Sequence, residues 1–208
     1  MKYWDFFSRQ AGKPSGLFGR WYMARLFDRG NDRLNRLMET QVAAQNGQRI
    51  LEIGCGTGKL LGRLASAVGN GLVEGVEYSR TMAKLARKNN AQAIKAGRAE
   101  IQEGDFNALP LPENAYSAIC TCNTIYFWPE PLATLRKAHR LLAPGGLLAV
   151  AFEDKARMEA KPISQEVFRL HARDEVKELL IQAGFGPGVE IREAEGDPPG
   201  FCCAVARK

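Results

Sequence analysis

One stretch, residues 49–60, constrains the fold of this chain more than any other. It reads R-I-L-E-I-G-C-G-T-G-K-L: a short apolar run, three alternating glycines and the start of an apolar helical pattern. Such a pattern predicts a strand, a tight turn and a helix. Gly54, Gly56 and Gly58 permit left-handed backbone angles and let a ligand approach the main chain closely. The unpaired N–H groups of the following helix would face that ligand.

The acidic residue before the glycines narrows the choice of ligand. The dinucleotide fingerprint requires glycine at position 59, where this chain has Lys59. Glu52 would repel a pyrophosphate and favours a ligand with a cationic end. At these residues, E-I-G-C-G-T-G, the sequence resembles the class I S-adenosylmethionine-dependent methyltransferases, whose first motif is an acidic residue, any residue and G-x-G-x-G. The resemblance implies S-adenosylmethionine as cofactor, S-adenosylhomocysteine as product, and a binding loop that includes Cys55.

A second acidic residue lies where a ribose ligand is expected. Glu77 ends an apolar run and lies 23 positions beyond the first glycine of the motif. In βαβ units, an acidic residue about 20 positions past the glycines accepts hydrogen bonds from ribose hydroxyls. We assign this role to Glu77 and expect Tyr78 and Met82 to pack on the adenine. Ser79 is the expected N-cap of a helix that reaches about residue 90.

The third predicted strand, residues 98–104, is closed by E-G-D-F. The resemblance implies that Asp105 accepts a hydrogen bond from the adenine amine and that Phe106 stacks on the base or binds it through its backbone. A carboxylate suits an amine donor, although aspartate at a strand end also serves as a simple turn former.

A fourth strand is predicted at residues 116–122, which are almost continuously small or apolar and therefore suit a strand buried on both faces. Ligands in this class of fold bind beyond the carboxyl ends of the strands. We therefore expect Asn123 and Thr124 to contact the methionine end of the cofactor. Tyr126 and Trp128 would form an aromatic wall for the methyl acceptor, with filling of the core as the competing interpretation.

The rest of the chain continues the alternation of strand and helix, which predicts an α/β, doubly wound sheet. By resemblance this is a Rossmann-like, seven-stranded, mostly parallel sheet in the order 3-2-1-4-5-7-6 with an antiparallel last strand, preceded by N-terminal helices. The segments expected after the fourth strand are a helix at 131–142, a fifth strand after the P-G-G turn, a mobile charged loop at 153–165, a helix at 173–183 and a final hairpin of strands 189–194 and 201–206.

The N-terminal part is expected to form a separate unit. Residues 1–16 mix aromatic and polar residues and end in G-K-P-S-G, which predicts an irregular arm. Two short helices should follow before residue 47. We therefore divide the chain into residues 1–47, a helical arm or lid, and residues 48–208, the cofactor-binding domain. Helices that simply pack on the sheet are the alternative.

Length and charge set further limits. At 208 residues and 45% hydrophobic, the chain can form one domain with a substantial core. Its net charge is +6, and residues 1–40 hold eight Lys and Arg against four Asp and Glu. Such an arm could steer an anionic substrate, a nucleic acid or a peripheral membrane contact, or could be a solvated face. With no transmembrane run and no signal-peptide pattern, the expected location is cytoplasmic.

Cysteine and histidine give little indication of a metal site. The five cysteines form no C-x-x-C pair, and the two histidines, His139 and His171, lie at no zinc-like spacing from them. We therefore expect reduced thiols and no metal. A three-thiolate arsenic site that includes Cys120 and Cys122 is the alternative to core packing.

The function that we expect is S-adenosylmethionine-dependent methyl transfer to an oxygen, nitrogen or carbon of a small molecule. The resemblance is greatest to the small-molecule branch that includes quinone-biosynthesis methyltransferases. The alternatives are an RNA methyltransferase that uses the basic arm, a protein that binds the cofactor without turnover, and aminopropyl transfer. The C-N-T-I-Y sequence after the fourth strand differs from the N-P-P-Y type of nucleic-acid amino methyltransferases. No catalytic residue is assigned, although Tyr126 and His171 are candidate bases, and the oligomeric state stays open.

Overall fold

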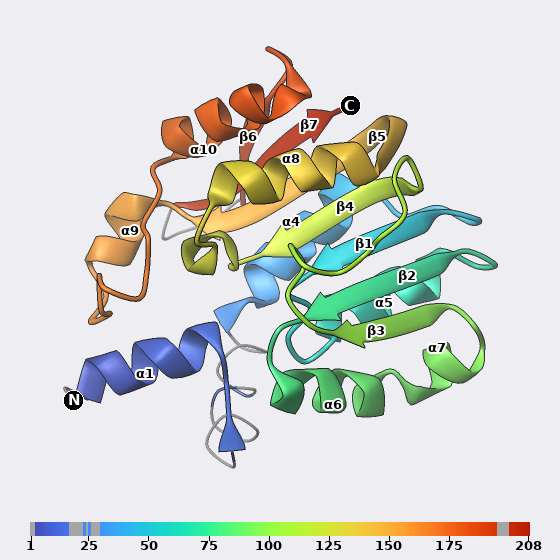
Figure 1. The fold of residues 1–208 in the computed structure, drawn as a ribbon, viewed down its shortest axis with the longest axis horizontal. Helices are drawn as coiled ribbons and strands as arrows, with labels where there is room; N and C mark the ends of the chain where they lie inside the picture. Colours follow the sequence, from blue (N-terminus) through green and yellow to red (C-terminus); the bar gives the residue numbers. More distant parts are fainter. Residues whose placement is uncertain (1–2, 17–22, 24, 26–29, 195–199) are drawn as a thin grey trace.

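A single sheet of seven strands forms the centre of the molecule. The computed structural model describes residues 3–16, 23, 25, 30–194 and 200–208. Within them the strand order is β3-β2-β1-β4-β5-β7-β6 (Figure 1). The strands are β1 (Arg49–Ile53), β2 (Leu72–Glu77), β3 (Ala99–Glu103), β4 (Tyr116–Cys122), β5 (Leu142–Glu153), β6 (Glu190–Glu193) and β7 (Phe201–Arg207).

The pairing of the strands confirms the predicted topology. β1 pairs in parallel with both β2 and β4, and the parallel pairing extends to β3 on one side and β5 on the other. β7 runs antiparallel to its two neighbours, β5 and β6. Because β2 and β4 lie on opposite sides of β1, the chain reverses its direction of progress across the sheet at this strand. A crevice at the carboxyl ends of β1 and β4 is where such folds bind ligands.

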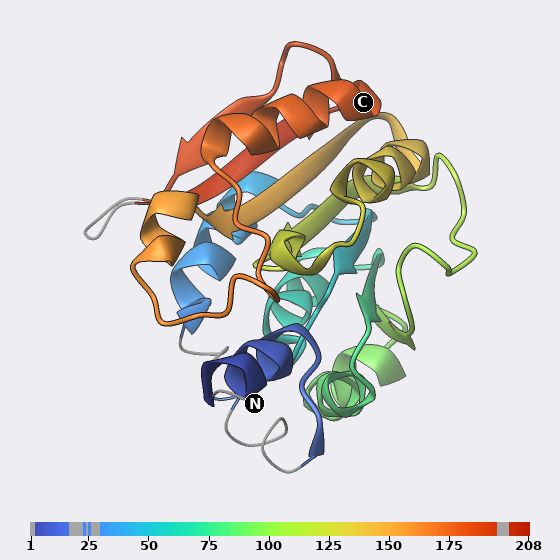
Figure 2. The ribbon, with the colours of Figure 1, turned by 60° about the vertical axis from the view of Figure 1, so that its left-hand side comes forward.

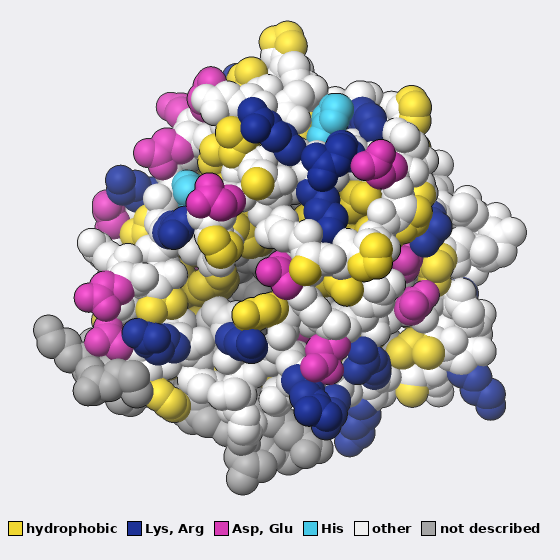
Figure 3. All heavy atoms as spheres, viewed as in Figure 1, with side chains coloured by type: hydrophobic (Ala, Val, Ile, Leu, Met, Phe, Trp, Pro, Cys, Tyr) yellow, Lys and Arg dark blue, Asp and Glu magenta, His cyan; other side chains and the backbone are white. Residues whose placement is uncertain are grey.

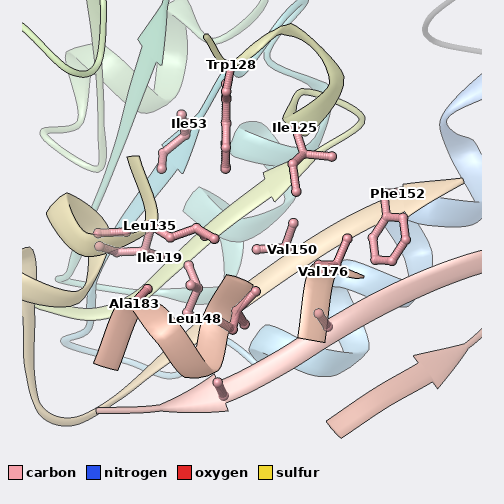
Figure 4. Close-up of a cluster of buried hydrophobic side chains, with 14 of the residues drawn as sticks. Ile53, Ile119, Ile125, Trp128, Leu135, Leu148, Val150, Phe152, Val176 and Ala183 are labelled. Carbon is pink, nitrogen blue, oxygen red and sulfur yellow. The ribbon is translucent and has the colours of Figure 1, made fainter. Parts of the chain in front are cut away.

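Helices cover both faces of the sheet, as Figures 1 and 2 show. Two hydrophobic clusters result: α8 and α10 pack on one face, and α4, α5 and α6 pack on the other. Figure 4 shows the first cluster, in which Val176 and Ala183 approach the apolar side chains of β4 and β5. The helical elements are α1 (Tyr3–Gly12), α4 (Asp32–Val42), α5 (Lys59–Ala67), α6 (Arg80–Asn89), α7 (Ala91–Lys95), η2 (Ile125–Phe127), α8 (Pro131–Leu141), α9 (Lys155–Glu159), α10 (Arg173–Leu180) and η3 (Ile181–Phe185).

The N-terminal arm is more regular than the sequence suggested. Residues 1–16 were expected to be irregular, but α1 occupies Tyr3–Gly12. Phe7 and Ala11 lie four residues apart, on one face of the helix, and both line a cavity at the carboxyl ends of the strands. The G-K-P-S-G breaker therefore ends a helix at Gly12 and does not prevent one, since proline and glycine commonly follow a helix C-terminus.

The charged segment at 153–165, predicted as a loop, contains the short helix α9. Met158 is buried on its inner side, which gives this one-turn helix an apolar contact. The first of the two short helices predicted before residue 47 and the tip of the final hairpin fall largely on residues outside the described ones. Among the residues that are described, none of the helices combines the length and the apolar character that crossing a bilayer requires.

Candidate active site

The carboxyl ends of the strands border a cavity of about 710 Å³. This volume suits a drug-sized ligand. α1 and the segment that contains α9 lie across the same end of the sheet in Figures 1 and 2. The space-filling view from the same side has hydrophobic side chains gathered in a hollow left of the centre (Figure 3). The structure brings every residue predicted to bind the cofactor or the acceptor, except Gly58, to the cavity lining.

The three glycines of the turn have left-handed φ angles of 72°, 55° and 76° at Gly54, Gly56 and Gly58. A Cβ atom on Gly54 would lie 2.5 Å from Thr124 Cγ2, and one on Gly58 would lie 2.3 Å from Asn90 Nδ2. These two glycines are therefore required by contacts within the protein. A Cβ on Gly56 would meet no protein atom within 4 Å, so Gly56 is the glycine whose bare backbone faces open space.

Glu52 is the most unusual polar group of the cavity. Its side chain is 3% exposed, and its Oε2 atom has no hydrogen-bond partner among the described residues. Burial, followed by the charge of Glu77, raises the pKa of this carboxyl well above its usual value, while a backbone hydrogen bond from Leu61 lowers it. A buried carboxylate oxygen without a donor suits a cationic ligand group and opposes a phosphate.

Glu77 ties the end of β2 to the glycine turn. Its Oε2 atom accepts a hydrogen bond from the Gly56 N–H at 2.8 Å, and its Oε1 atom accepts one from the Ser79 N–H at 2.7 Å. Burial raises the pKa of this carboxyl, and the backbone N–H donors oppose that shift. Each oxygen keeps a second lone pair, so the carboxylate can still accept hydrogen bonds from ligand hydroxyls.

Asp105 and Phe106 line the cavity directly after β3, the strand next to β2. Asp105 is exposed, and its Oδ1 atom accepts a hydrogen bond from the Asn107 N–H at 2.9 Å. Phe106 is buried. The Lys137 Nζ atom of α8 donates to the backbone oxygens of Phe106, Asn107 and Leu109 at 2.6, 3.1 and 2.6 Å. The three donors of one ammonium group therefore hold this loop in place.

Tyr78 and Met82 lie next to Glu77 but differ in exposure. Tyr78 is 54% exposed, and the Lys13 Nζ atom lies 3.9 Å from its ring centroid. Met82 is buried. Ser79 caps α6, as predicted, by accepting a hydrogen bond from the Met82 N–H at 3.3 Å, and its hydroxyl donates to the backbone oxygen of Pro14 at 2.5 Å. The residue that caps α6 thus also holds the segment after α1.

The loop after β4 is fixed by side-chain hydrogen bonds. Asn123 has a φ of 55°, which is uncommon for a residue with a side chain. Its Nδ2 atom donates to Asn31 Oδ1 at 2.8 Å, and its Oδ1 atom lies 3.1 Å from the Tyr126 hydroxyl oxygen. The Thr124 hydroxyl is hydrogen-bonded to that of Thr121. These bonds connect the loop to the N-terminal segment.

Tyr126 and Trp128 present their rings to the cavity. The Tyr126 hydroxyl points to the end of β5, where it donates to the backbone oxygen of Glu153 at 3.0 Å and accepts a hydrogen bond from the Glu153 N–H. Burial raises the pKa of this hydroxyl well above its usual value. Phe168 packs on the Tyr126 ring with a centroid distance of 5.8 Å. Tyr126 is thus both a core residue and part of the wall.

The histidines and cysteines contribute little to the cavity. Neither His139 nor His171 lines it, and burial lowers the pKa of both imidazoles. The His139 ring packs on Phe185. All five cysteines are free and buried, and Cys55 and Cys122 are the two that line the cavity. Within the described part of the chain, no three His, Cys, Asp or Glu side chains gather as a metal site would require.

Several residues at the site were missed by sequence reasoning. Lys137 holds the loop of Asp105, Asn31 binds Asn123, and Lys161 lines the cavity from the segment after α9. None of the three belongs to a motif that can be recognised in the sequence, because tertiary packing brings each of them to the site from a distant part of the chain. Lys137 lies two residues before His139 on α8, and nothing in the sequence around it indicates a role at the site.

Comparison with known proteins agrees with this geometry. Residues 50–146 match the family described as "Methyltransferase domain". The chain is 27% identical over 160 residues to "O-methyltransferase cnsE" of Penicillium expansum, covering 74% of this chain and 58% of that protein. It is 25% identical over 178 residues to "Uncharacterized methyltransferase YdaC" of Bacillus subtilis, covering 86% and 93%. It is 27% identical over 139 residues to the ubiquinone/menaquinone biosynthesis C-methyltransferase UbiE of Yersinia enterocolitica, covering 66% and 55%. The chain thus spans little more than half of two of these relatives.

Solved structures share the fold. A SAM-dependent methyltransferase from Aquifex aeolicus superimposes with a TM-score of 0.67 at 24% identity, covering 89% of this chain and 96% of that one. The [4+2]-cyclase SpnF gives a TM-score of 0.70 at 22% identity, covering 86% and 82%. At these identities the likeness establishes the fold alone.

Proposed function

Because the chain belongs to the class I S-adenosylmethionine-dependent methyltransferases, we propose that it transfers a methyl group from S-adenosylmethionine to a small-molecule acceptor. The relatives include proteins named as O-methyltransferases and a C-methyltransferase. The acceptor atom that we propose is an oxygen, nitrogen or carbon nucleophile.

The observation that carries the proposal is the buried carboxylate of Glu52. Its Oε2 atom has no partner among the described residues, and the side chain lines the cavity. A positively charged ligand would stabilise this carboxylate, whereas a phosphate would be repelled by it. S-adenosylmethionine carries an ammonium and a sulfonium group and no phosphate. The residues present therefore fit this cofactor better than a nucleotide.

The other assignments follow from the same arrangement. Glu77 would accept hydrogen bonds from the ribose hydroxyls, and Asp105 would accept one from the adenine amine. The remaining residues that we assign to the cofactor are Gly54, Cys55 and Gly56 through their backbone, Gly58 through the shape of the turn, Tyr78, Met82 and Phe106 beside the adenine, and Asn123 and Thr124 at the methionine end. Gly58 acts indirectly, because it shapes the turn without lining the cavity.

The bound cofactor supplies an electrophilic methyl group on a sulfonium. The protein's part is to hold the acceptor in line with that methyl and to exclude water, an effect that can contribute roughly 7 to 11 kcal/mol in favourable cases. The rings of Tyr126 and Trp128 would form the acceptor wall. The Tyr126 hydroxyl is already bound to the Glu153 backbone. We therefore assign Tyr126 to positioning and leave the reaction without a dedicated base.

Residues 1–47 would act as a lid on a methyltransferase domain of residues 48–208. The Ser8 Oγ atom accepts a hydrogen bond from the Ser164 N–H at 2.9 Å, and the Pro14 backbone oxygen accepts one from Ser79. A Cβ on Gly12 would lie 2.9 Å from the Phe127 ring. These contacts join α1 and the residues after it to the segment after α9, to the start of α6 and to η2. In hydrogen-exchange measurements, Ser8→Ala should increase exchange in residues 3–16 and S-adenosylhomocysteine should decrease it.

A transfer assay tests the function directly. Purified protein and cofactor with a labelled methyl group are incubated separately with metabolite fractions and with RNA. The proposal predicts label in a small molecule and none in RNA. Label in RNA, with salt-dependent binding, would support the RNA methyltransferase that the basic arm suggested. Binding of cofactor without label transfer in any fraction would support a different activity, since one similar structure is named a cyclase.

A further inference from the structure

The acceptor end of the cavity is apolar except for one ion cluster. Its aromatic and aliphatic lining comes from α1, from η2 with the residue after it, and from the segment around α9: Phe7, Phe127, Trp128, Met158, Ile163 and Phe168. The charged side chains that line this end are Glu153, the last residue of β5, and Lys161. The apolar part of an acceptor bound here would therefore contact the hydrophobic lining, and a polar group on it would form its hydrogen bonds or ion pair with Glu153 and Lys161.

The cluster consists of one carboxylate and two cations. Glu153 is 7% exposed, and its Oε2 atom accepts hydrogen bonds from Arg157 Nε at 2.7 Å and from Lys161 Nζ at 2.5 Å. One buried carboxylate thus binds two cations. Arg157 also lies over the Phe201 ring, 4.2 Å from its centroid, on the side of β7. Of the two cations, Lys161 is the one that lines the cavity.

Lys161 also keeps hydrogen-bond donors available. An ammonium group has three N–H donors, and among the described residues Glu153 accepts one of them. The neighbouring polar groups are committed elsewhere, since the Tyr126 hydroxyl is bound to the Glu153 backbone and Asn123 is bound to Asn31. The Lys161 side chain is 38% exposed, so a ligand can reach it.

From these contacts we infer that the methyl acceptor is an apolar, aromatic molecule that carries an acidic group, and that Lys161 binds this group as its carboxylate or equivalent anion. The inference rests on the proposed methyl transfer and names the substrate class of the same site. Lys161 is a specificity-determining residue in this account. An amine-bearing acceptor is disfavoured, because its ammonium would meet the like charge of Lys161. A charge-assisted hydrogen bond in an apolar surrounding gives the selectivity.

The test uses the full chain saturated with S-adenosylhomocysteine and matched ligands built on one, two and three fused aromatic rings. Each set contains a hydroxy carboxylate, its neutral amide and its aminomethyl counterpart, such as 6-hydroxy-2-naphthoate with the corresponding amide and amine. Affinities are measured by calorimetry at neutral pH. At least one carboxylate should bind about tenfold more tightly than its amide and still more tightly than its amine. Equal binding within every set, or no carboxylate binding at 1 mM, would overturn the inference.

Variants connect the selectivity to Lys161. Lys161→Met should abolish the preference for the carboxylate while leaving the affinity for S-adenosylhomocysteine unchanged, and Lys161→Arg should retain the preference. Lys155→Met is the matched control, because Lys155 belongs to the same segment but does not line the cavity. A preference that survives in Lys161→Met contradicts the assignment. If S-adenosylhomocysteine fails to bind the unmodified protein, the proposed function itself fails, so the two failures are distinguishable.

Discussion

The Glu77 Oε2 atom accepts a hydrogen bond from the backbone N–H of Gly56 at 2.8 Å. This bond joins the end of β2 to the turn after β1, so the residue expected to bind ribose also fixes the loop expected to bind the methionine end of the same ligand. Substitution of Glu77 should therefore affect both the fold and the cofactor.

Glu77→Gln should weaken binding of S-adenosylhomocysteine at least severalfold. An amide keeps only one acceptor oxygen, so one of the N–H groups of Gly56 and Ser79 faces an amide donor. The free energy of unfolding should fall by about 1 to 3 kcal/mol, the usual cost of an unsatisfied buried polar group. Glu103→Gln is the control, since Glu103 pairs with Glu77 in the sheet but is exposed. Calorimetry and urea unfolding measure both effects, and unchanged affinity would refute the ribose assignment.

Glu52→Gln should have opposite effects on stability and binding. The pKa of Glu52 is raised in the folded protein above its ordinary value of 4.5, so the folded state holds a proton that the unfolded state releases. The contribution of Glu52 to the free energy of unfolding is therefore largest below about pH 4.5 and is lost as pH rises through the folded pKa. The glutamine variant should lack this decrease and be more stable than the unmodified protein near neutral pH.

The same variant should bind S-adenosylhomocysteine more weakly, because it lacks the negative charge that a ligand ammonium would meet. In the unmodified protein, binding should release protons and weaken as pH falls below the folded pKa of Glu52. Titrations in buffers of different ionisation enthalpy detect the protons. Glu74→Gln is the contrast: Glu74 is paired with Arg49 at 2.5 Å and with the Tyr116 hydroxyl at 3.2 Å, so its substitution should destabilise. Destabilisation by Glu52→Gln would contradict the account.

Gly54→Ala and Gly56→Ala should separate folding from binding. Both positions have left-handed backbones, which costs an alanine roughly 1 to 2 kcal/mol. At Gly54 the new methyl also collides with Thr124, whereas at Gly56 it points into open space. Urea unfolding should show the larger loss for Gly54→Ala. Gly56→Ala should lose more free energy of S-adenosylhomocysteine binding than free energy of unfolding. Equal stability of the two variants would contradict the assignment of Gly54 to folding and of Gly56 to binding.

Lys137→Met should loosen the loop that presents Asp105. The variant keeps the apolar stem but removes three hydrogen bonds to backbone oxygens. We expect a severalfold weaker affinity for S-adenosylhomocysteine and faster hydrogen exchange in residues 104–109. Arg136→Met, an exposed neighbour on α8, should change neither. If exchange in the loop stays unchanged, Lys137 has no positioning role.

The sequence predicted the strands well because their signals are local. The apolar runs at β1 and β4 end at the glycine turn and at Cys122, as the pattern indicated. The order of the strands came from the resemblance, since no local pattern specifies which strands are neighbours. α1 was predicted wrongly because its apolar residues face a cavity, and composition alone does not reveal such a partner.

The sequence predicted the site residues that belong to motifs at strand ends, but not those that reach the site from helices and loops. Glu52, Glu77 and Asp105 stand at the ends of three strands, so the topology alone brings them together. Lys137 and Lys161 come from α8 and from the segment after α9, and their contacts depend on how these elements pack. The role of Gly54 also needed the structure, because the atom that excludes a side chain there belongs to Thr124.

Calorimetry on the unmodified chain gives the most direct test of the central claim that the cavity holds an adenosyl ligand with a cationic end. S-adenosylmethionine and S-adenosylhomocysteine should both bind at a single site, and both should bind more weakly to Glu52→Gln. Heat on addition of NADH or ATP, with none for either sulfur compound, would contradict it.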